Sequence, residues 1–195
     1  MTGFLRLVLG PMFAGKTTEL INTYYNLVFT ENVIAINYYL DTRYDEILLT
    51  SHNGEKIPCL MIDSLFDAWY NPKNEFFEKL NNAQYILINE GQFFENLYYI
   101  VKDMLVNNKQ VFIYALDGDF QQKKFGEVLD LVPLCDEIKK LNAKCFHCGG
   151  IAIFTHRITD EMNQIDIGVN NYIPLCRKCF PKESNDDIDK IPDVD

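Results

Sequence analysis

The amino-acid sequence predicts an α/β fold, a doubly wound and mostly parallel sheet with a small C-terminal lobe. Over roughly the first two thirds of the chain, short apolar segments alternate with stretches of helical periodicity, and two C-x-x-C pairs follow. Such alternation is typical of a parallel sheet covered by helices on both faces. The 195 residues are enough for one main core and one small appendage.

The expected strands are short, apolar and bounded by polar residues or glycine, and they are Leu5–Leu9, Val33–Tyr38, Tyr85–Ile88 and Val111–Leu116. Apolar residues at spacings of three and four predict helices over Thr17–Phe29 and Phe93–Asn107. A third helical stretch, residues 64–82, contains Asn71-Pro72. Proline disfavours helix in the residue before it, so we expect a break there.

Composition excludes several functions. The net charge of −10 argues against general nucleic-acid binding, which needs clustered Lys and Arg. No apolar run reaches the ~18 residues of a membrane helix, so we expect no membrane partner. The first apolar segment carries Arg6 and leads into a glycine-containing loop, which favours a buried strand over a signal peptide. We therefore expect a cytoplasmic protein.

A phosphate-binding motif follows the first expected strand. The pattern G-x-x-x-x-G-K-[ST] is matched by Gly10, Pro11, Met12, Phe13, Ala14, Gly15, Lys16 and Thr17. In this motif backbone N–H groups and the positive end of a helix surround phosphate oxygens. Lys16 would neutralise β- and γ-phosphate oxygens, and the Thr17 hydroxyl could bind Mg²⁺. Its place between a strand and a helix is the context that this motif requires.

A second polar group ends the strand that begins at Tyr85. The segment Ile86–Phe94 reads ILINEGQFF, so Asn89 and Glu90 follow an apolar run. Ligands of open α/β sheets bind at the carboxyl ends of the strands. Glu90 there could act as a general base on an acceptor hydroxyl. The alternative is a surface glutamate at a strand end.

Cysteines predict a metal site in the last third of the chain. Two C-x-x-C pairs supply four thiolates that suit tetrahedral zinc, namely Cys145, Cys148, Cys176 and Cys179. A redox pair or coincidence is the alternative. We expect His147 to be exposed and not a ligand, and Cys59 and Cys135 to be small buried hydrophobic residues.

These patterns divide the chain into three parts. Residues 1–143 form the expected nucleotide-binding domain, and 144–181 the zinc-binding lobe, with short strands at Ile151–Phe154 and Ile165–Ile167. Residues 182–195 are acidic and almost free of aromatics, which predicts a disordered tail.

The motifs taken together closely resemble the type II thymidine kinases. The resemblance runs from about Leu7 to Cys179 through GPMFAGKTTELI, DTRY at 41–44, NEGQFF, ALDGDFQQKKFG at 115–126, LVPL at 131–134 and the paired C-x-x-C. It implies a P-loop, RecA-like fold and transfer of phosphate from ATP to thymidine, with Mg²⁺ and a structural Zn²⁺. It also implies a homotetramer and inhibition by thymidine triphosphate.

The resemblance also assigns roles to residues. Glu90 corresponds to the catalytic base, and Lys16 and Arg43 lie near the transferred phosphate. ATP and Mg²⁺ would be bound by residues 10–18, which end in Thr18, together with Asn89 and Gln92. The nucleoside would be bound by Met12, Asp41, Phe93, Leu116, Phe120, Phe125, Thr155, Gly168, Val169 and Tyr172. From the residues alone, the aromatic members of this set could enclose a flat ring, although aromatics at such spacing more often belong to the core. A loop at 165–172, borne by the zinc lobe, would cover the base and exclude water.

Two departures from the family pattern have consequences. Asn89 stands where the family has Asp, so we expect weaker metal binding and slower turnover, because an amide brings no charge. Val169 stands where the family has a second glycine, and the spacing to Tyr172 is one residue shorter, which affects base selectivity. The alternatives are a deoxynucleoside kinase that prefers deoxyuridine or deoxycytidine, and a nucleotide-binding sensor or scaffold without catalysis.

Overall fold

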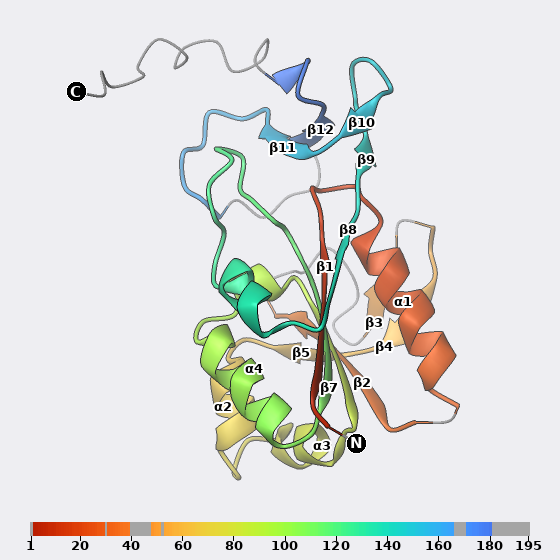
Figure 1. Ribbon diagram of the computed structural model, residues 1–195, viewed down its shortest axis with the longest axis vertical. Coiled ribbons are helices and arrows are strands. Elements are labelled where there is room, and N and C mark those ends of the chain that lie inside the picture. Colours follow the sequence, from red (N-terminus) through yellow and green to blue (C-terminus); the bar gives the residue numbers. More distant parts are fainter. Residues whose placement is uncertain (1, 30, 40–47, 52, 166–170, 181–195) are drawn as a thin grey trace, which may run out of the picture.

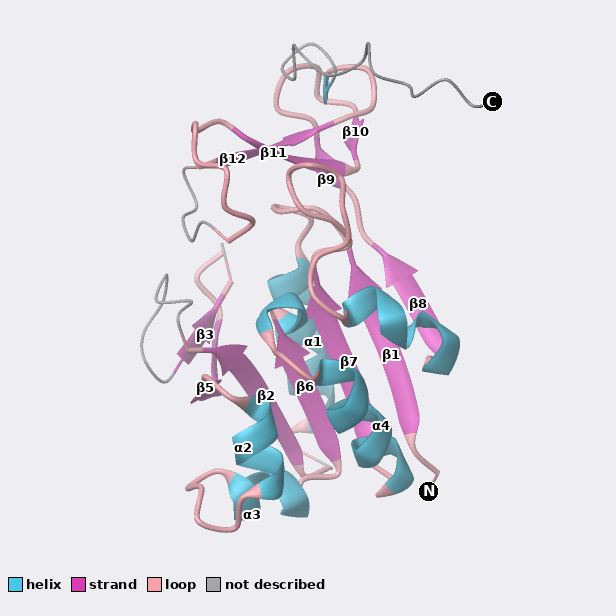
Figure 2. Cartoon of the chain, turned by 90° about the vertical axis from the view of Figure 1, so that its left-hand side faces the viewer, coloured by secondary structure: helices cyan, strands magenta, loops and turns pink. Residues whose placement is uncertain are grey.

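The computed structural model describes residues 2–29, 31–39, 48–51, 53–165 and 171–180. Its main sheet has the strand order β5-β2-β6-β7-β1-β8, with every neighbouring pair parallel. The strands are β1 (Phe4–Leu9), β2 (Val33–Tyr38), β5 (Leu60–Ile62), β6 (Tyr85–Asn89), β7 (Gln110–Ala115) and β8 (Glu137–Lys140). Figure 2 shows their carboxyl ends directed toward the C-terminal strands β9 to β12.

Helices cover both faces of this sheet (Figure 1). One face carries α1 (Lys16–Leu27), and the other carries α2 (Leu65–Tyr70), α3 (Phe77–Asn82) and α4 (Leu97–Val106). Two 3-10 helices, η1 (Gly91–Phe93) and η2 (Val128–Leu134), follow β6 and β7. The doubly wound, parallel α/β class is therefore confirmed.

Alternating side chains of the strands build a core on each face. Leu5, Leu7 and Leu9 of β1 are buried among residues of α2 and α4, whereas Val8 is buried with Leu20 of α1. Burial of each such side chain contributes about 1.5–3 kcal/mol. Both cores continue along β6 and β7, and they hold the loops at the carboxyl edge on a rigid support.

Three two-stranded antiparallel sheets complete the described part of the chain. They pair β3 (Leu48–Thr50) with β4 (Lys56–Pro58), β9 (Ala143–Lys144) with β10 (Ile151–Ala152), and β11 (Phe154–Arg157) with β12 (Tyr172–Leu175). A separate apolar cluster, which includes Ala152, Leu175 and three cysteines, lies under the last two pairs. The boundary placed between residues 143 and 144 stays a prediction.

Some expected elements need correction. The helix expected from Phe93 begins only at Leu97, because Phe94 is extended and Asn96 has a left-handed backbone with φ 58°. The break after Asn71 is confirmed, with α2 ending at Tyr70 and α3 beginning at Phe77.

Other element boundaries also differ from the expectation. The strand expected at 151–154 is two strands, since residue 153 separates β10 from β11 and these belong to different sheets. Helix α1 spans 16–27 where 17–29 was expected, β6 extends to residue 89, and β7 spans 110–115 where 111–116 was expected.

Several expectations fall outside the described residues. They concern Asp41, Arg43, Gly168 and Val169, most of the strand expected at 165–167, and the acidic tail; Ile165 itself has irregular backbone. Among the helices of the described ranges, none combines the length and the apolar character needed to cross a bilayer.

Candidate active site

The phosphate-binding motif forms the turn between β1 and α1. Gly10 directly follows β1, and Gly15 precedes α1 with a left-handed backbone, φ 82°. This conformation favours glycine, and a Cβ built at Gly15 would meet no atom within 4 Å. The turn therefore presents backbone at the N-terminus of a twelve-residue helix, where N–H groups and the helix dipole favour an anion.

Lys16 is the first residue of α1 and its side chain folds back over this turn. Its Nζ donates hydrogen bonds to the carbonyl oxygens of Gly10 (3.1 Å) and Pro11 (2.8 Å), and the residue is buried. A buried ammonium group is costly unless polar atoms surround it, so these carbonyls hold the charge within the loop. Thr17 and Thr18 follow in the first turn of the helix, half-buried.

Glu90 lies immediately after β6 in a backbone conformation that is uncommon for a residue with a side chain. Its φ of 51° and ψ of 43° are left-handed. Such conformations cluster at functional sites, where the surrounding structure compensates the strain. Here the chain turns into η1, and Glu90 is left half-exposed at the carboxyl edge of the sheet.

Gln92 holds the Glu90 carboxylate. Its Nε2 donates to Glu90 Oε2 at 2.7 Å, while its Oε1 accepts from the backbone N–H of Leu116 at 3.1 Å. Gln92 is 3% exposed; its bond to Leu116 is buried, and its bond to the half-exposed Glu90 is part-buried. Hydrogen bonds to a carboxylate are about twice as strong as neutral ones. The buried Gln92 amide thus links Glu90 to the segment after β7.

Asn89 forms a buried pair with Asn37 at the ends of β6 and β2. Its Nδ2 donates to Asn37 Oδ1 at 2.9 Å, and both residues are almost fully buried. Because side chains alternate along a strand, Asn89 shares its sheet face with Leu87, which packs against Leu20 of α1. The amide pair therefore lies on the face that α1 covers, at the edge where this helix begins.

The motif loop and Glu90 lie at the same edge of the sheet, with one strand between them. In the sheet, β7 separates β6 from β1. Neighbouring strands lie about 4.8 Å apart, so the ends of β6 and β1 lie about 10 Å apart. That distance accommodates a phosphate on the loop and a second group in front of Glu90, which is the requirement for transfer between two bound substrates.

The aromatic residues expected to bind the nucleoside fall into two groups. Phe93 contacts Phe125 edge-on at 5.4 Å and stacks on Tyr38 at 5.2 Å. Phe120 instead lies under the Arg157 guanidinium, 3.9 Å from its Cζ, and the same guanidinium lies 5.1 Å from the Tyr172 ring. Phe125 is buried, whereas Phe93, Phe120 and Tyr172 are half-buried.

The C-terminal strands contact the motif loop directly. Thr155 of β11 is buried, and its Oγ1 accepts a hydrogen bond from the backbone N–H of Met12 at 3.0 Å. Arg157, two residues further, is also buried and faces the same side of the strand. The strand pair β11–β12 therefore connects the phosphate-binding motif loop with the residues that contact Arg157.

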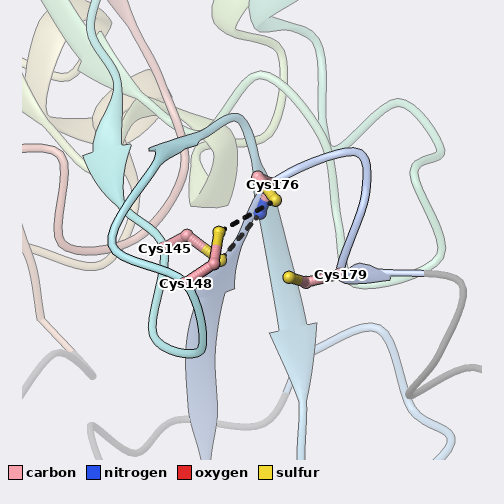
Figure 3. A group of neighbouring side chains, drawn as sticks. All are labelled: Cys145, Cys148, Cys176 and Cys179. Carbon is pink, nitrogen blue, oxygen red and sulfur yellow. Dashed lines mark hydrogen bonds between the residues drawn. The ribbon is translucent and has the colours of Figure 1, made fainter.

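Four cysteines converge in the C-terminal part, as Figure 3 shows. The sulfur atoms of Cys145, Cys148, Cys176 and Cys179 all lie within 4.8 Å of one another, and Cys148 and Cys176 approach to 3.6 Å. In a tetrahedron with Zn–S bonds of ~2.3 Å the sulfurs are about 3.8 Å apart, so the set could hold zinc. The Cys148 backbone N–H is the main group that lowers the pKa of Cys145 to about 6, which favours its thiolate.

The remaining cysteines and His147 behave differently. His147 is exposed and lies outside the cysteine group, as expected. Cys59 and Cys135 are only half-buried, where buried positions were expected, and each packs against the rim of a core.

Three residues of the site escaped the sequence interpretation: Asn37, Tyr38 and Arg157. A polar residue inside the apolar run VIAINY could have indicated Asn37. No local pattern distinguishes Arg157, because its contacts come from distant segments.

The fold and this edge define the class of the protein: a P-loop α/β protein with a cysteine-bearing C-terminal lobe. The thymidine kinase family model matches residues 3–180. The chain belongs to the thymidine kinase family, and the resemblance inferred from the motifs is confirmed.

Several relatives match over nearly the whole chain. The thymidine kinase of Yaba monkey tumor virus is 37% identical over 189 residues, 94% of this chain and 98% of that protein. Thymidine kinase 1 of Dictyostelium discoideum is 35% identical, over 95% of this chain and 81% of its own. The cytosolic thymidine kinase of Bos taurus is 34% identical, over 94% and 74% respectively. These relatives favour a thymidine kinase over the sensor or a kinase of shifted preference.

Proposed function

We propose that the chain transfers the γ-phosphate of ATP to the 5′-hydroxyl of thymidine, giving ADP and thymidine monophosphate. The observation that carries this proposal is the position of the motif loop and Glu90 at one edge of one sheet, with a single strand between them. Membership of the family supports the choice of nucleoside and phosphate donor.

In this mechanism Glu90 takes the proton of the 5′-hydroxyl as that oxygen forms its bond to the γ-phosphorus. The bond between the γ-phosphorus and the bridging oxygen breaks, and its electron pair leaves with ADP. The Gln92 amide keeps the carboxylate directed toward the acceptor. A positioned base of this kind contributes about 10²–10⁴-fold to a rate.

The motif loop binds the phosphates. Residues 10–18 would supply backbone N–H groups, and Lys16 would turn from the Gly10 and Pro11 carbonyls toward the β- and γ-oxygens. The Thr17 hydroxyl and the Asn89 amide oxygen would ligate Mg²⁺, which would neutralise phosphate charge. The Asn89 N–H already donates to Asn37, which leaves the amide oxygen to accept or ligate. Arg43, outside the described residues, would assist near the transferred phosphate.

The nucleoside base would lie between two aromatic groups, one containing Phe93 and the other containing Phe120. Phe125 packs against Phe93, and Tyr172 contacts the same Arg157 guanidinium as Phe120. Leu116 and Thr155, which bond to Gln92 and to Met12, are assigned to the nucleoside by resemblance. Asp41, Gly168 and Val169 are assigned to the same substrate by resemblance. Aromatic rings offer a base a flat surface, and backbone groups would read its edges.

Zinc would be structural. The donor set of four cysteines leaves no open position, which is typical of structural sites. Through β11 and β12 such an ion would stabilise the contact of Thr155 with Met12. We further propose a cytoplasmic homotetramer that thymidine triphosphate inhibits by occupying the acceptor site. The cytosolic bovine relative supports the location.

Steady-state kinetics test this proposal. ADP release would be measured with ATP, Mg²⁺ and thymidine, deoxyuridine or deoxycytidine, for the natural chain and for Lys16→Met and Glu90→Gln. Glu95→Gln is the control, since Glu95 is an exposed neighbour of the same chemistry. We expect thymidine to be preferred, Glu90→Gln to lose about 10²-fold or more in kcat while still binding thymidine, and Glu95→Gln to be unchanged. Full activity of Glu90→Gln would refute the assignment.

A further inference from the structure

We propose that Arg157 is a positioning residue for nucleoside binding: it holds Phe120 and Tyr172 in place and thereby sets the KM for thymidine. This inference rests on the proposed nucleoside site. Arg157 lies on β11, and its side chain reaches three separate segments of the chain. These are the strand β12, the loop at 161–164, and the segment that follows β7.

The Tyr172 hydroxyl is held by two hydrogen bonds from one guanidinium. Arg157 Nε donates to it at 3.1 Å and Nη2 at 2.5 Å. In both bonds the phenolic oxygen is the acceptor, and its own O–H group can still donate. Arg157 therefore fixes the position of the Tyr172 ring through its hydroxyl oxygen.

The flat face of the same guanidinium fixes Phe120. Its Cζ lies 3.9 Å from the centroid of that ring, well inside the range of cation–π attraction. Phe120 is half-buried in the segment 117–125, whereas Arg157 is only 5% exposed. A buried cation therefore lies against one face of the half-buried Phe120 ring.

The remaining N–H groups of Arg157 tie the loop before β12 to this arrangement. Nη1 donates to the carbonyl oxygens of Glu161 (2.7 Å) and Asn163 (2.5 Å), and Nη2 to that of Gln164 (3.1 Å). Gln164 in turn donates from Nε2 to Asp119 Oδ2 at 2.6 Å. Asp119 precedes Phe120, so the network closes on the segment that carries this ring.

Lysine could not replace this arginine. Its ammonium is a compact charge without the planar fork that contacts a ring with its face and several oxygens with its edge. If Arg157 served only to stabilise the fold, its loss would lower the melting temperature and affect both substrates alike. If it positions Phe120 and Tyr172, its loss acts on thymidine and spares ATP, whose proposed site is the motif loop.

The test compares Arg157→Lys with Arg177→Lys in the full-length, zinc-loaded protein. Arg177 is an exposed arginine of the same lobe that also lies over a ring, 5.1 Å from Phe154, but outside the network. For Arg157→Lys we expect the KM for thymidine to rise about 10- to 100-fold, the loss expected for charge-assisted hydrogen bonds, with kcat and the KM for ATP within about twofold. Arg177→Lys leaves all three constants unchanged.

A double-mutant cycle with Tyr172→Phe adds a second measurement. Phenylalanine removes the acceptor of two Arg157 bonds, so we expect the Arg157→Lys change to raise the KM for thymidine much less in the Tyr172→Phe background. Equal effects in both backgrounds, an unchanged KM in the single variant, or matching losses for thymidine and ATP together with a lower melting temperature would each overturn the inference. Absence of thymidine-dependent ADP release by the natural chain would refute the proposed function as well.

Discussion

The substitution Gly126→Ala tests whether the segment after β7 positions Glu90 at the carboxyl edge of the sheet. Gly126 has a left-handed backbone with φ 59°, and a Cβ there would lie 2.2 Å from the Gln92 carbonyl oxygen. Ordinary contact begins at 3.4 Å, so one of the two segments must move by about 1.2 Å. Gln92 is the residue that holds the Glu90 carboxylate, so the displacement reaches the proposed base.

Two costs combine in this variant. A left-handed backbone costs a residue with a side chain about 1–2 kcal/mol, and forcing atoms into a packed region adds about 1–3 kcal/mol. The expected loss in the free energy of unfolding is about 2–5 kcal/mol. For a chain of this size, each kcal/mol lowers the melting temperature by about 2–4 °C. A shift of about 1 Å in a catalytic group can also lower kcat by about 10²-fold.

Gly54→Ala is the matched control. Gly54 has a similar backbone, φ 84°, but a Cβ there meets nothing within 4 Å. We expect only the backbone cost, about 1–2 kcal/mol, and an unchanged kcat. Thermal unfolding and thymidine-dependent ADP release measure both variants. If the two alanine variants matched each other in stability and in kcat, the link from Gly126 through Gln92 to Glu90 would be wrong.

Three further predictions concern the metal sites and pH. Asn89→Asp adds a carboxylate near the start of α1, so the Mg²⁺ concentration that gives half-maximal rate should fall and kcat should rise. The change should also lower stability, because the position is buried. A Mg²⁺ titration that matches that of the natural chain refutes this prediction. Cys148→Ser should reduce bound zinc well below one per chain and lower the melting temperature, whereas Cys135→Ser, outside the cysteine group, should retain the metal; equal zinc contents by atomic absorption would contradict it. Burial raises the pKa of Tyr114 to about 12, so the folded chain keeps a proton that the unfolded chain releases near pH 10. The contribution of Tyr114 to stability is therefore full below pH 10 and falls by about 2–3 kcal/mol toward pH 12, and Tyr114→Phe should flatten this fall in denaturant titrations.

The sequence predicted those parts of the fold that local patterns determine. The four central strands are buried on both faces and therefore read as continuous apolar runs. The edge strands β5 and β8 escaped, because the first has three residues and the second reads EIKK, which carries no apolar pattern. The start of α4 was placed too early, since apolar spacing continues through Phe93 and Phe94 although Asn96 interrupts the helix.

In the candidate site, too, only features that local sequence patterns determine could be predicted. Motifs with contiguous residues, the loop at Gly10–Thr17 and the C-x-x-C pairs, could be read directly, and the structure brings the four cysteines together. The Leu116–Gln92 bond, the Asn37–Asn89 pair and the Arg157 network join segments that are far apart in the chain. Such contacts depend on strand order and register, which a single sequence does not reveal.

The central claim is that the Lys16 loop binds the phosphates of ATP while Glu90 faces the 5′-hydroxyl of thymidine. A crystal structure with thymidine and a non-hydrolysable ATP analogue measures this directly. We predict phosphates against the backbone of residues 10–18, and a Glu90 carboxylate oxygen within about 3.2 Å of the 5′-oxygen. A thymidine 5′-hydroxyl turned away from Glu90, or phosphates bound elsewhere than on the Lys16 loop, would contradict the account.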